Sequence, residues 1–252
     1  MTQFKHVTLW AAMALIFIGC TPDPDPPVPT PDPISDCFDF AMTTQPYDTI
    51  VGGTMIDDLY DYSLIEVPIG FSFDFCGEPF DHLYFNELAP SPTFSFEQLP
   101  DVLDLRYQEL ILFGQLLVEP LELLGSGGPD TISQVIYQTS GPVGNQVFTM
   151  EYRDWGFPSN QLGQPSHYVF DMTLKLYENG NRIEIHYGGN SVATPLQGDP
   201  FKWLQVGLYG DDPNQGFYLY GDPANPDSSA TILFSKEMET WPDSGTVYQF
   251  LQ

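Results

Sequence analysis

Basic residues are the scarcest feature of this sequence. Seven Lys and Arg stand against 34 Asp and Glu, which gives a formal net charge of −27. So few cations cannot neutralise a phosphate backbone, so we expect no binding to nucleic acid. An anionic membrane surface would also repel the folded part. The chain is nevertheless 42% hydrophobic and 15% aromatic, so it can bury a sizeable core and differs from disordered acidic chains.

An apolar run long enough to span a membrane is missing from the N-terminus. Residues 9–18 are apolar and follow Lys5, but about ten residues fall short of the roughly 20 that a spanning helix needs. This pattern predicts a secretory signal over 1–19. Ile18-Gly19-Cys20 resembles the bacterial lipobox, which implies a lipid on the sulfur of Cys20, although Phe17 departs from the usual Leu. The alternative is an ordinary secretory signal with a chance cysteine.

Residues 20–36 follow as the expected lipidated cysteine and a stalk. Seven Pro and four Asp lie within residues 21–36. Such a segment has nothing to bury, and its prolines favour extended polyproline II at about 3.1 Å per residue. The acids after Cys20 also resemble the signal that exports some bacterial lipoproteins to the outer face of the outer membrane. We therefore expect a lipid-anchored protein of the bacterial outer membrane, exposed at the cell surface.

Cysteine is rare, with three in the chain. If Cys20 carries the lipid, Cys37 and Cys76 remain in a compartment that permits disulfides. We predict that they pair and tie the start of the domain to an early strand. The alternative is two separate thiols.

Hydrophobic residues alternate with a period of two from residue 62 onward, which indicates strands with one face packed on a core. The Asn179-Gly180 pair between two such runs predicts an antiparallel hairpin with a two-residue turn. Helix is expected at most over 98–109 and 115–124, and a buried strand pair over 110–124 is the alternative. We predict an all-β antiparallel sandwich in a single domain, 37–252. The expected strands cover 71–75, 80–86, 93–97, 110–113, 132–139, 148–152, 167–177, 182–188, 203–209, 216–220, 231–234 and 246–251.

Several of these segments resemble, in order, a module of secreted and surface proteins in outer-membrane bacteria. They are 67–77 and 80–86, the hairpin over 135–155, the hairpin over 170–187, and 244–250. The resemblance implies a jelly-roll sandwich of the lectin-like or nidogen-like kind and assigns no function. Two expected stretches are missing: Asn86-Glu87-Leu88-Ala89-Pro90 replaces a Ser-Asn-Gly turn, and 113–117 stands where Trp-Asp-Asp-Leu is usual.

No pattern of catalytic residues stands out. A Gly-x-Ser-x-Gly elbow is missing. Glu151 and Asp154 are three apart and would point to opposite faces of a regular strand, so they do not form a glycosidase pair. Glu184 stands alone on its face beside Arg182 and His186, which we interpret as charge partners across strands. We therefore expect no catalytic residues.

The sequence also contains no clear pattern of a metal or ligand site. The histidines of the mature chain, His82, His167 and His186, do not share a metal-like spacing, so we expect no zinc and no other cofactor. Calcium is a weak alternative at 211–216 or at Asp57, Asp58 and Asp61, where turn chemistry or a solvated loop explains the same residues. Aromatic side chains could stack on sugars, with core packing as the alternative. These are Trp155, Phe157, Tyr218, Tyr220 and Trp241.

The first hypothesis for function is a non-catalytic surface module that binds a glycan or a protein. A structural envelope lipoprotein within a larger assembly is the second, and a glycan hydrolase with an unrecognised site is the third. Residues 37–252 keep 30 acidic and 6 basic residues. Because this excess is spread over turns and outward strand faces, we interpret it as a coat that favours solubility at an exposed surface.

Overall fold

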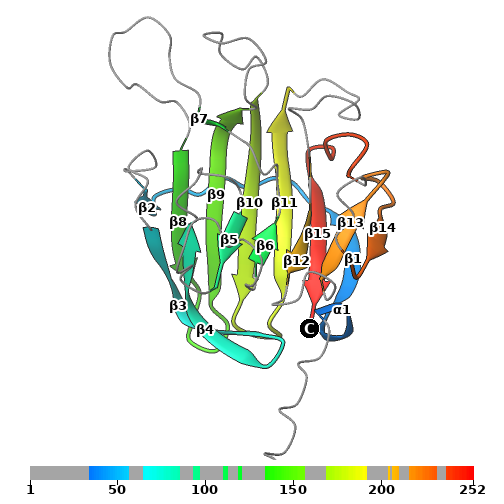
Figure 1. The fold of residues 1–252 in the computed structure, drawn as a ribbon. Coiled ribbons are helices and arrows are strands. Elements are labelled where there is room, and N and C mark those ends of the chain that lie inside the picture. Colours follow the sequence, from blue (N-terminus) through cyan, green and yellow to red (C-terminus); the bar gives the residue numbers. More distant parts are fainter. Residues whose placement is uncertain are drawn as a thin grey trace, which may run out of the picture. The chain divides into compact units, whose positions relative to one another are not determined.

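The chain folds into two antiparallel β-sheets packed face to face, as seen in a computed structural model (Figure 1). Residues Asp32–Gln252 form one compact unit, five residues longer than the predicted domain. The structure describes residues 34–56, 65–85, 93–96, 110–112, 119–120, 134–156, 169–191, 204, 206–209, 216–231 and 237–252. No helix within these residues is long and apolar enough to cross a membrane.

The first sheet has the strand order β1-β15-β11-β10-β9-β8-β2, and β7 also pairs with β9. The second sheet has the order β14-β13-β12-β6-β5-β4-β3. The all-β antiparallel sandwich predicted from the sequence is therefore confirmed. The elements are α1 (Ile34–Cys37), β1 (Asp39–Thr44), β2 (Thr54–Met55), β3 (Ile65–Phe75), β4 (Glu78–Phe85), β5 (Thr93–Ser95), β6 (Leu110–Leu112), β7 (Glu119–Pro120), β8 (Gln134–Ser140), β9 (Val147–Gly156), β10 (Val169–Tyr177), β11 (Ile183–Asn190), β12 (Val206–Tyr209), β13 (Phe217–Tyr220), β14 (Asp227–Ser229) and β15 (Thr246–Leu251).

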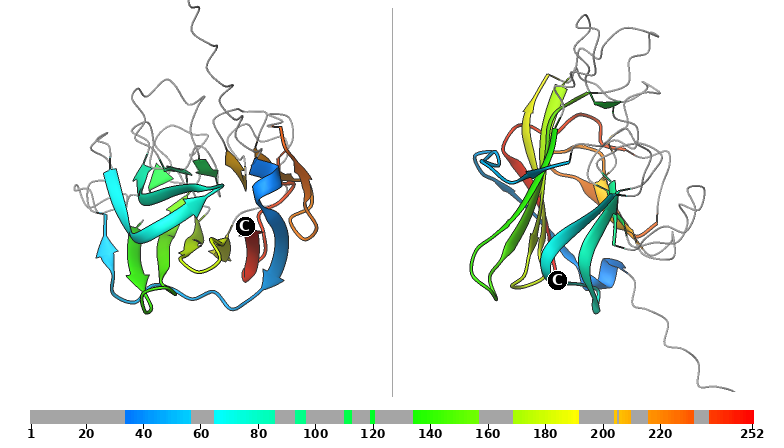
Figure 2. Two further views of the ribbon diagram at one scale, coloured as in Figure 1. Left: turned by 90° about the horizontal axis from the view of Figure 1, so that it is seen from below. Right: turned by 90° about the vertical axis from the view of Figure 1, so that its left-hand side faces the viewer.

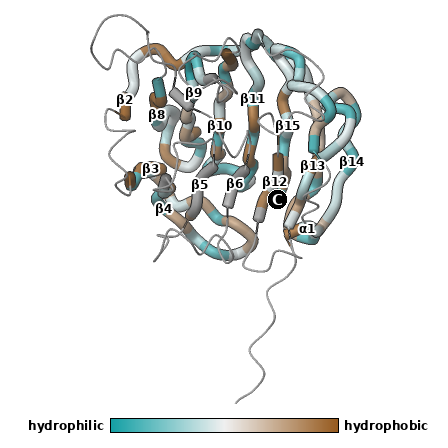
Figure 3. Tube along the Cα trace, turned by 45° about the horizontal axis from the view of Figure 1, so that its top comes forward, coloured by the Kyte–Doolittle hydropathy of each residue, from teal (hydrophilic) through white to brown (hydrophobic). Residues whose placement is uncertain are grey.

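The period of two in the sequence places one face of each long strand in the core. Along β3, every second residue from Val67 to Phe75 is buried. Brown and teal segments alternate along the strands in Figure 3. The largest fully buried side chains are aromatic, and their packing between the two sheets holds the sandwich together. They are Trp155, Tyr152, Tyr187, Tyr248, Phe73, Phe75, Phe148, Phe170 and Phe250.

The central strands of the first sheet are buried on both faces, which the sequence did not suggest. Glu151 and Thr173 point away from the core, yet they are 0% and 1% exposed. The cover over them comes from residues 45–53, which we call the strap. The strap joins β1 to β2, and these two strands lie at opposite edges of the first sheet. It therefore crosses the outer face of that sheet, as the blue trace in Figures 1 and 2 shows.

The disulfide predicted between Cys37 and Cys76 is confirmed. Cys37 ends α1, and Cys76 forms a two-residue hairpin turn with Gly77 between β3 and β4. Both turn residues have positive φ, 53° and 92°, which is the conformation of a type I′ turn. Ile34 and Phe38 on either side of α1 are buried in the core. α1 and the buried Ile34 thus lie inside the segment 20–36 that the sequence predicted to be stalk.

Two local predictions need correction. The hairpin between β10 and β11 forms, but its positive-φ residues are Gly180 and Asn181, and Tyr177 N donates to Arg182 O at 3.0 Å. The turn is therefore longer than a two-residue Asn179-Gly180 turn. The strand predicted over 231–234 is preceded by an observed strand, β14, at Asp227–Ser229. Of the predicted range, residues 232–234 lie outside the described part.

The regions predicted to hold helix are only partly described. Residues 98–109 lie outside the described part, and within 115–124 the two described residues, Glu119 and Pro120, form strand β7.

Candidate functional site: the polar cluster beneath the strap

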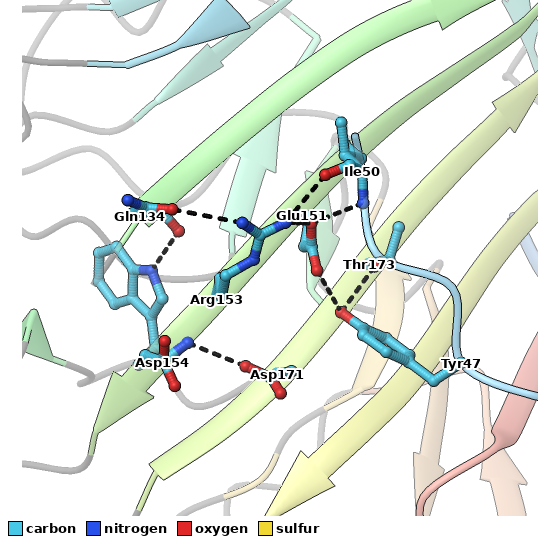
Figure 4. Close-up of polar contacts among 9 residues, drawn as sticks. Tyr47, Ile50, Gln134, Glu151, Arg153, Asp154, Asp171 and Thr173 are labelled. Carbon is cyan, nitrogen blue, oxygen red and sulfur yellow. Dashed lines mark hydrogen bonds and ion pairs between the residues drawn. The ribbon is translucent and has the colours of Figure 1, made fainter. Parts of the chain in front are cut away.

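The outward face of β9 and β10 carries a polar cluster beneath the strap (Figure 4). Glu151 on β9 lies directly opposite Thr173 on β10 in the antiparallel register. Arg153 follows two positions after Glu151 and so lies on the same face. Tyr47 and Ile50 reach this cluster from the strap. The cluster therefore joins residues that lie more than 100 positions apart in the sequence.

Glu151 is the centre of the cluster, and three donors surround its buried carboxylate. The guanidinium of Arg153 donates from Nη2 at 2.6 Å, and the backbone N of Ile50 donates at 2.9 Å. The hydroxyl of Tyr47 donates at 3.4 Å. Arg153 Nη2 also donates to the carbonyl of Ile50 at 3.0 Å. Because a buried charge is costly unless it is paired and hydrogen-bonded, these contacts make Glu151 an anchor for the strap.

Tyr47 links the strap to the middle of the sheet. Its hydroxyl accepts a hydrogen bond from Thr173 Oγ1 at 2.8 Å. Burial raises the pKa of Tyr47 well above its usual value, so this hydroxyl stays protonated and can donate to Glu151. The ring lies over Gly188 of β11, where a Cβ atom would come within 2.8 Å of it. A glycine inside a strand marks a close approach of another group, and here that group is the strap.

A β-bulge interrupts β9 beside Glu151 and corrects the expectation of a regular strand. Tyr152 pairs with Met172 and Trp155 pairs with Phe170, so Arg153 and Asp154 together face Asp171. Asp154 has a φ of 55°, and its backbone N donates to Asp171 Oδ1 at 2.9 Å. The rule that residues three apart point to opposite faces does not hold across such a bulge.

Asp171 is the half-buried member of this carboxylate group. Burial raises its pKa, and the neighbouring charges of Asp154 and Glu151 raise it further, against the effect of the hydrogen bond from Asp154 N. The hydrogen bond between Arg153 and Glu151 raises the pKa of the Arg153 guanidinium. Arg153 therefore keeps its charge and neutralises the buried carboxylate.

A second buried carboxylate, Glu184, lies on the same outward face in β11. Its oxygens contact Tyr177 Oη at 2.6 Å, Gln249 Nε2 at 2.6 Å and His186 Nε2 at 2.9 Å. Arg182 Nε lies 3.0 Å from Glu184 Oε1. Burial favours a higher pKa for Glu184, but the hydrogen bonds from His186, Tyr177 and Gln249 and the charge of Arg182 lower it to about 2.

Arg182 and His186 do contact Glu184, but the prediction that they pair with it across strands is wrong. His186 lies on the same strand as Glu184, and Arg182 directly precedes that strand. The partners from neighbouring strands are Tyr177 of β10 and Gln249 of β15. The alternation of polar residues along 182–186 indicated Arg182 and His186 as partners of Glu184. The register that brings Tyr177 and Gln249 to Glu184 depends on tertiary pairing that the sequence does not reveal.

The histidines lie apart from one another where they are described. His82 on β4 contacts Asp81 at 2.8 Å and Glu66 at 3.4 Å on the surface, whereas His186 is buried beside Glu184. Within the described residues, no group of three or more His, Cys, Asp or Glu could hold a metal ion. His167, residues 211–215 and the trio Asp57, Asp58 and Asp61 lie outside the described part.

The aromatic residues considered for sugar stacking belong mainly to the core. Trp155 is 0% exposed and Trp241 is 4% exposed. The Trp241 ring packs at 4.5 Å from that of Phe170, and Trp155 Nε1 donates to Gln134 O at 2.9 Å. Tyr218 is also buried, and Tyr220 is half-buried. Core packing, the alternative reading, thus holds for these two tryptophans and for Tyr218, while Phe157 and Cys20 lie outside the described residues.

Comparison with known proteins yields one family. The model of a family described as NIDO related matches residues 125–252, which is half of the chain and contains β8 to β15. No curated protein and no solved structure shows a significant match.

Proposed function

The chain belongs to the NIDO-related family, and from this premise we propose that it is a non-catalytic, lipid-anchored binding module on the bacterial cell surface. Its ligand is a glycan or a protein of the surroundings. A lipid on Cys20 holds it at the outer membrane, and residues 21–33 act as a spacer. The β-sandwich carries the binding surface.

The order of features at the N-terminus is the observation that carries this proposal. A lipobox-like Ile18-Gly19-Cys20 precedes a Pro-rich segment, and Ile34 then enters the core directly. Cys37, three residues after Ile34, is bonded to Cys76. A disulfide fits a protein that leaves the reducing cytosol. Because the disulfide fixes the first residues of the domain, the domain would stay folded while the spacer connects it to the membrane.

The polar clusters argue against catalysis by their two buried carboxylates. Glu151 and Glu184 are 0% and 2% exposed, and both are hydrogen-bonded to groups of this chain. A general acid or base must reach a proton of the substrate, and these two carboxylates are turned to structural partners instead. Their arrangement suits the anchoring of the strap and of the sheet.

Membrane fractionation tests the anchor. Replacement Cys20→Ser should move the protein from the membrane fraction to the soluble fraction. The neighbouring Thr21→Ala variant is the matched control and should stay with the membrane. Membrane retention of the Cys20→Ser protein would contradict the anchor. In a separate test, protease treatment of intact cells should degrade the membrane-bound control if the domain lies on the outer face of the outer membrane.

Binding is tested separately on a glycan array, with capture of extracellular proteins as the second arm. Saturable binding in either arm supports a binding module and identifies the ligand class. If neither arm yields a ligand at high protein concentration, the structural envelope role is favoured instead. A glycan that is cleaved during the array assay would favour the hydrolase.

A further inference from the structure

The disulfide and the strap are parts of one covalently closed loop, which we call the belt and which runs from Cys37 to Cys76. The belt forms β1 at one edge of the first sheet, crosses the outer face as the strap, and forms β2 at the other edge. It continues to β3 in the second sheet and returns to Cys37 through the disulfide. β8, β9, β10, β11 and β15 therefore lie within the belt (Figure 2).

The inner side of the belt is fastened by β3. Thr139 Oγ1 of β8 donates to the carbonyl of Ile69 at 2.5 Å, which ties the belt to the β2 side of the first sheet. Near the disulfide, the ring of Phe75 packs 5.4 Å from that of Phe38, and Gln252 Nε2 donates to Asp74 Oδ1 at 2.7 Å. β3 thus runs from one edge of the first sheet toward the other, opposite the strap.

The outer half of the belt is paired at both ends, and its middle makes few apolar contacts. β1 pairs with β15 at six positions, and its Phe40 ring packs against Phe217 and Phe250, whereas β2 forms two residue pairs with β8. Within the strap, Ile50 is buried and Tyr47 is half-buried, while the other residues are exposed. A segment with few buried apolar contacts belongs to the part of a protein that opens locally at low free energy.

The surface beneath the strap favours local opening because it is polar. Glu151, Arg153, Asp171 and Thr173 would meet water if the strap lifted, and hydration of these groups offsets the loss of their contacts with Tyr47 and Ile50. The apolar core lies on the other face of the sheet. Lifting the strap therefore does not require the two sheets to separate.

We propose that the Cys37–Cys76 disulfide is a redox-sensitive clasp on this belt. With the clasp closed, β1, the strap and β2 remain in place. With the clasp reduced, they open as a unit while the remaining strands of the sandwich stay folded. Opening also frees the edges of β15 and β8, which pair with β1 and β2 in the closed form, and an unpaired edge can accept a strand from another chain. The proposal does not depend on the lipid anchor.

The redox step is an ordinary thiol–disulfide exchange. A thiolate of an external dithiol attacks one sulfur of the disulfide and displaces the other cysteine as a thiolate, which takes up a proton. The second thiol of the reductant then closes its own disulfide and releases the first cysteine. Two electrons and two protons pass to the protein in total. Both cysteines are half-buried and not enclosed, so a small dithiol can reach them.

Loop closure explains why the clasp controls opening. Without the disulfide, the N-terminal side of the belt is held by non-covalent contacts such as the packing of Ile34 and Phe38. Such a segment gains more conformational entropy when it lifts from the sheet than a closed loop does. The disulfide separates residues 39 positions apart, so its reduction should raise the opening equilibrium constant by roughly one hundredfold or more.

Hydrogen exchange of the full chain in mild detergent, with and without dithiothreitol, tests the clasp. Reduction should accelerate exchange at the amides of β1 and the strap by about a hundredfold or more, in proportion to the opening equilibrium constant, and leave the amides of β9, β10 and β11 protected. The Cys37→Ser/Cys76→Ser variant should exchange like the reduced protein in either condition. Unchanged exchange in β1 and the strap after verified reduction would overturn the proposal, as would uniform loss of protection across both sheets.

A nicked belt separates loop closure from the disulfide itself. Gly52 lies in the exposed part of the strap, with open space around its Cβ position, so a protease site can be inserted between Gly52 and Gly53. After cleavage with the disulfide intact, β1 and the strap should exchange as fast as in the reduced protein. If the cleaved, oxidised protein stays as protected as the intact one, closure of the belt has no role and the clasp model fails.

Discussion

The backbone amide of Ile50 donates a 2.9 Å hydrogen bond to the carboxylate of Glu151, across 101 positions of the sequence. This contact joins the strap to the centre of the first sheet. Because Glu151 is fully buried, its carboxylate oxygens depend on hydrogen bonds from the strap and from Arg153. The strap and the carboxylate therefore stabilise each other, and both should respond when either is changed.

Replacement Glu151→Gln should lower the free energy of unfolding by about 2 kcal/mol. The amide removes the negative charge opposite the half-buried Arg153 and puts an NH2 donor in place of one acceptor oxygen, so Arg153 loses its ion pair or the amide of Ile50 loses its acceptor. Chemical denaturation measures the effect. Glu66→Gln, at an exposed position of β3, is the control and should change stability by less than about 0.5 kcal/mol. Equal stability of the two variants would contradict the anchor role.

Gly188→Ala should destabilise the protein by about 1–3 kcal/mol through overpacking. The added Cβ would lie 2.7 Å from Asp171 Cβ and 2.8 Å from the Tyr47 ring, so the strap must shift. Gly189→Ala is a matched control on the same strand, since its Cβ would meet only Asp171 Oδ2 at 3.4 Å.

Thermal unfolding compares these two alanine variants. A Tyr47→Ala background should reduce the cost of Gly188→Ala, because the ring that causes much of the crowding is gone. An undiminished cost in that background would show that the strap is not the source of the crowding.

The regular strands were predictable because their alternation is local. Phe71, Phe73 and Phe75 define a buried face by themselves, and the same holds for Met172 and Leu174 of β10. The disulfide was also predictable, because the lipid expected on Cys20 leaves two cysteines, and the predicted export signal implies a compartment where they can pair. Such inferences need only neighbouring residues or simple counting.

The strap and the bulge were not predictable, because both depend on pairing between distant segments. β1 and β2 are adjacent in sequence but lie at opposite edges of the sheet, and neither has a strong alternating pattern. The bulge at Arg153 and Asp154 arises from register against Asp171, which a single strand does not encode. Trp155 was ambiguous for a related reason, since a buried and a ligand-stacking tryptophan look alike in a sequence.

Loss of the disulfide in Cys37→Ser/Cys76→Ser should lower the free energy of unfolding by about 4 kcal/mol, the loop-entropy value for cysteines 39 positions apart. Urea denaturation with and without reductant measures it. The oxidised natural chain should also be lighter than its reduced form by the mass of two hydrogen atoms. A double-Ser variant as stable as the oxidised protein would mean that the belt contributes nothing to folding.

Acid should remove the contribution of Glu184 to stability. Its pKa falls from 4.5 to about 2 in the folded protein, so its stabilising effect is fully present above about pH 5 and is lost as the pH falls from there toward 2. The full shift corresponds to roughly 3 kcal/mol. We expect Glu184→Gln to be less stable than the natural protein at pH 7 by about 2–3 kcal/mol, and the gap to narrow steadily between pH 5 and pH 2.5. Glu78→Gln, at an exposed position, should show a small gap without this trend. A gap for Glu184→Gln that stays constant with pH would mean that packing, and not the ionised carboxylate, accounts for its effect.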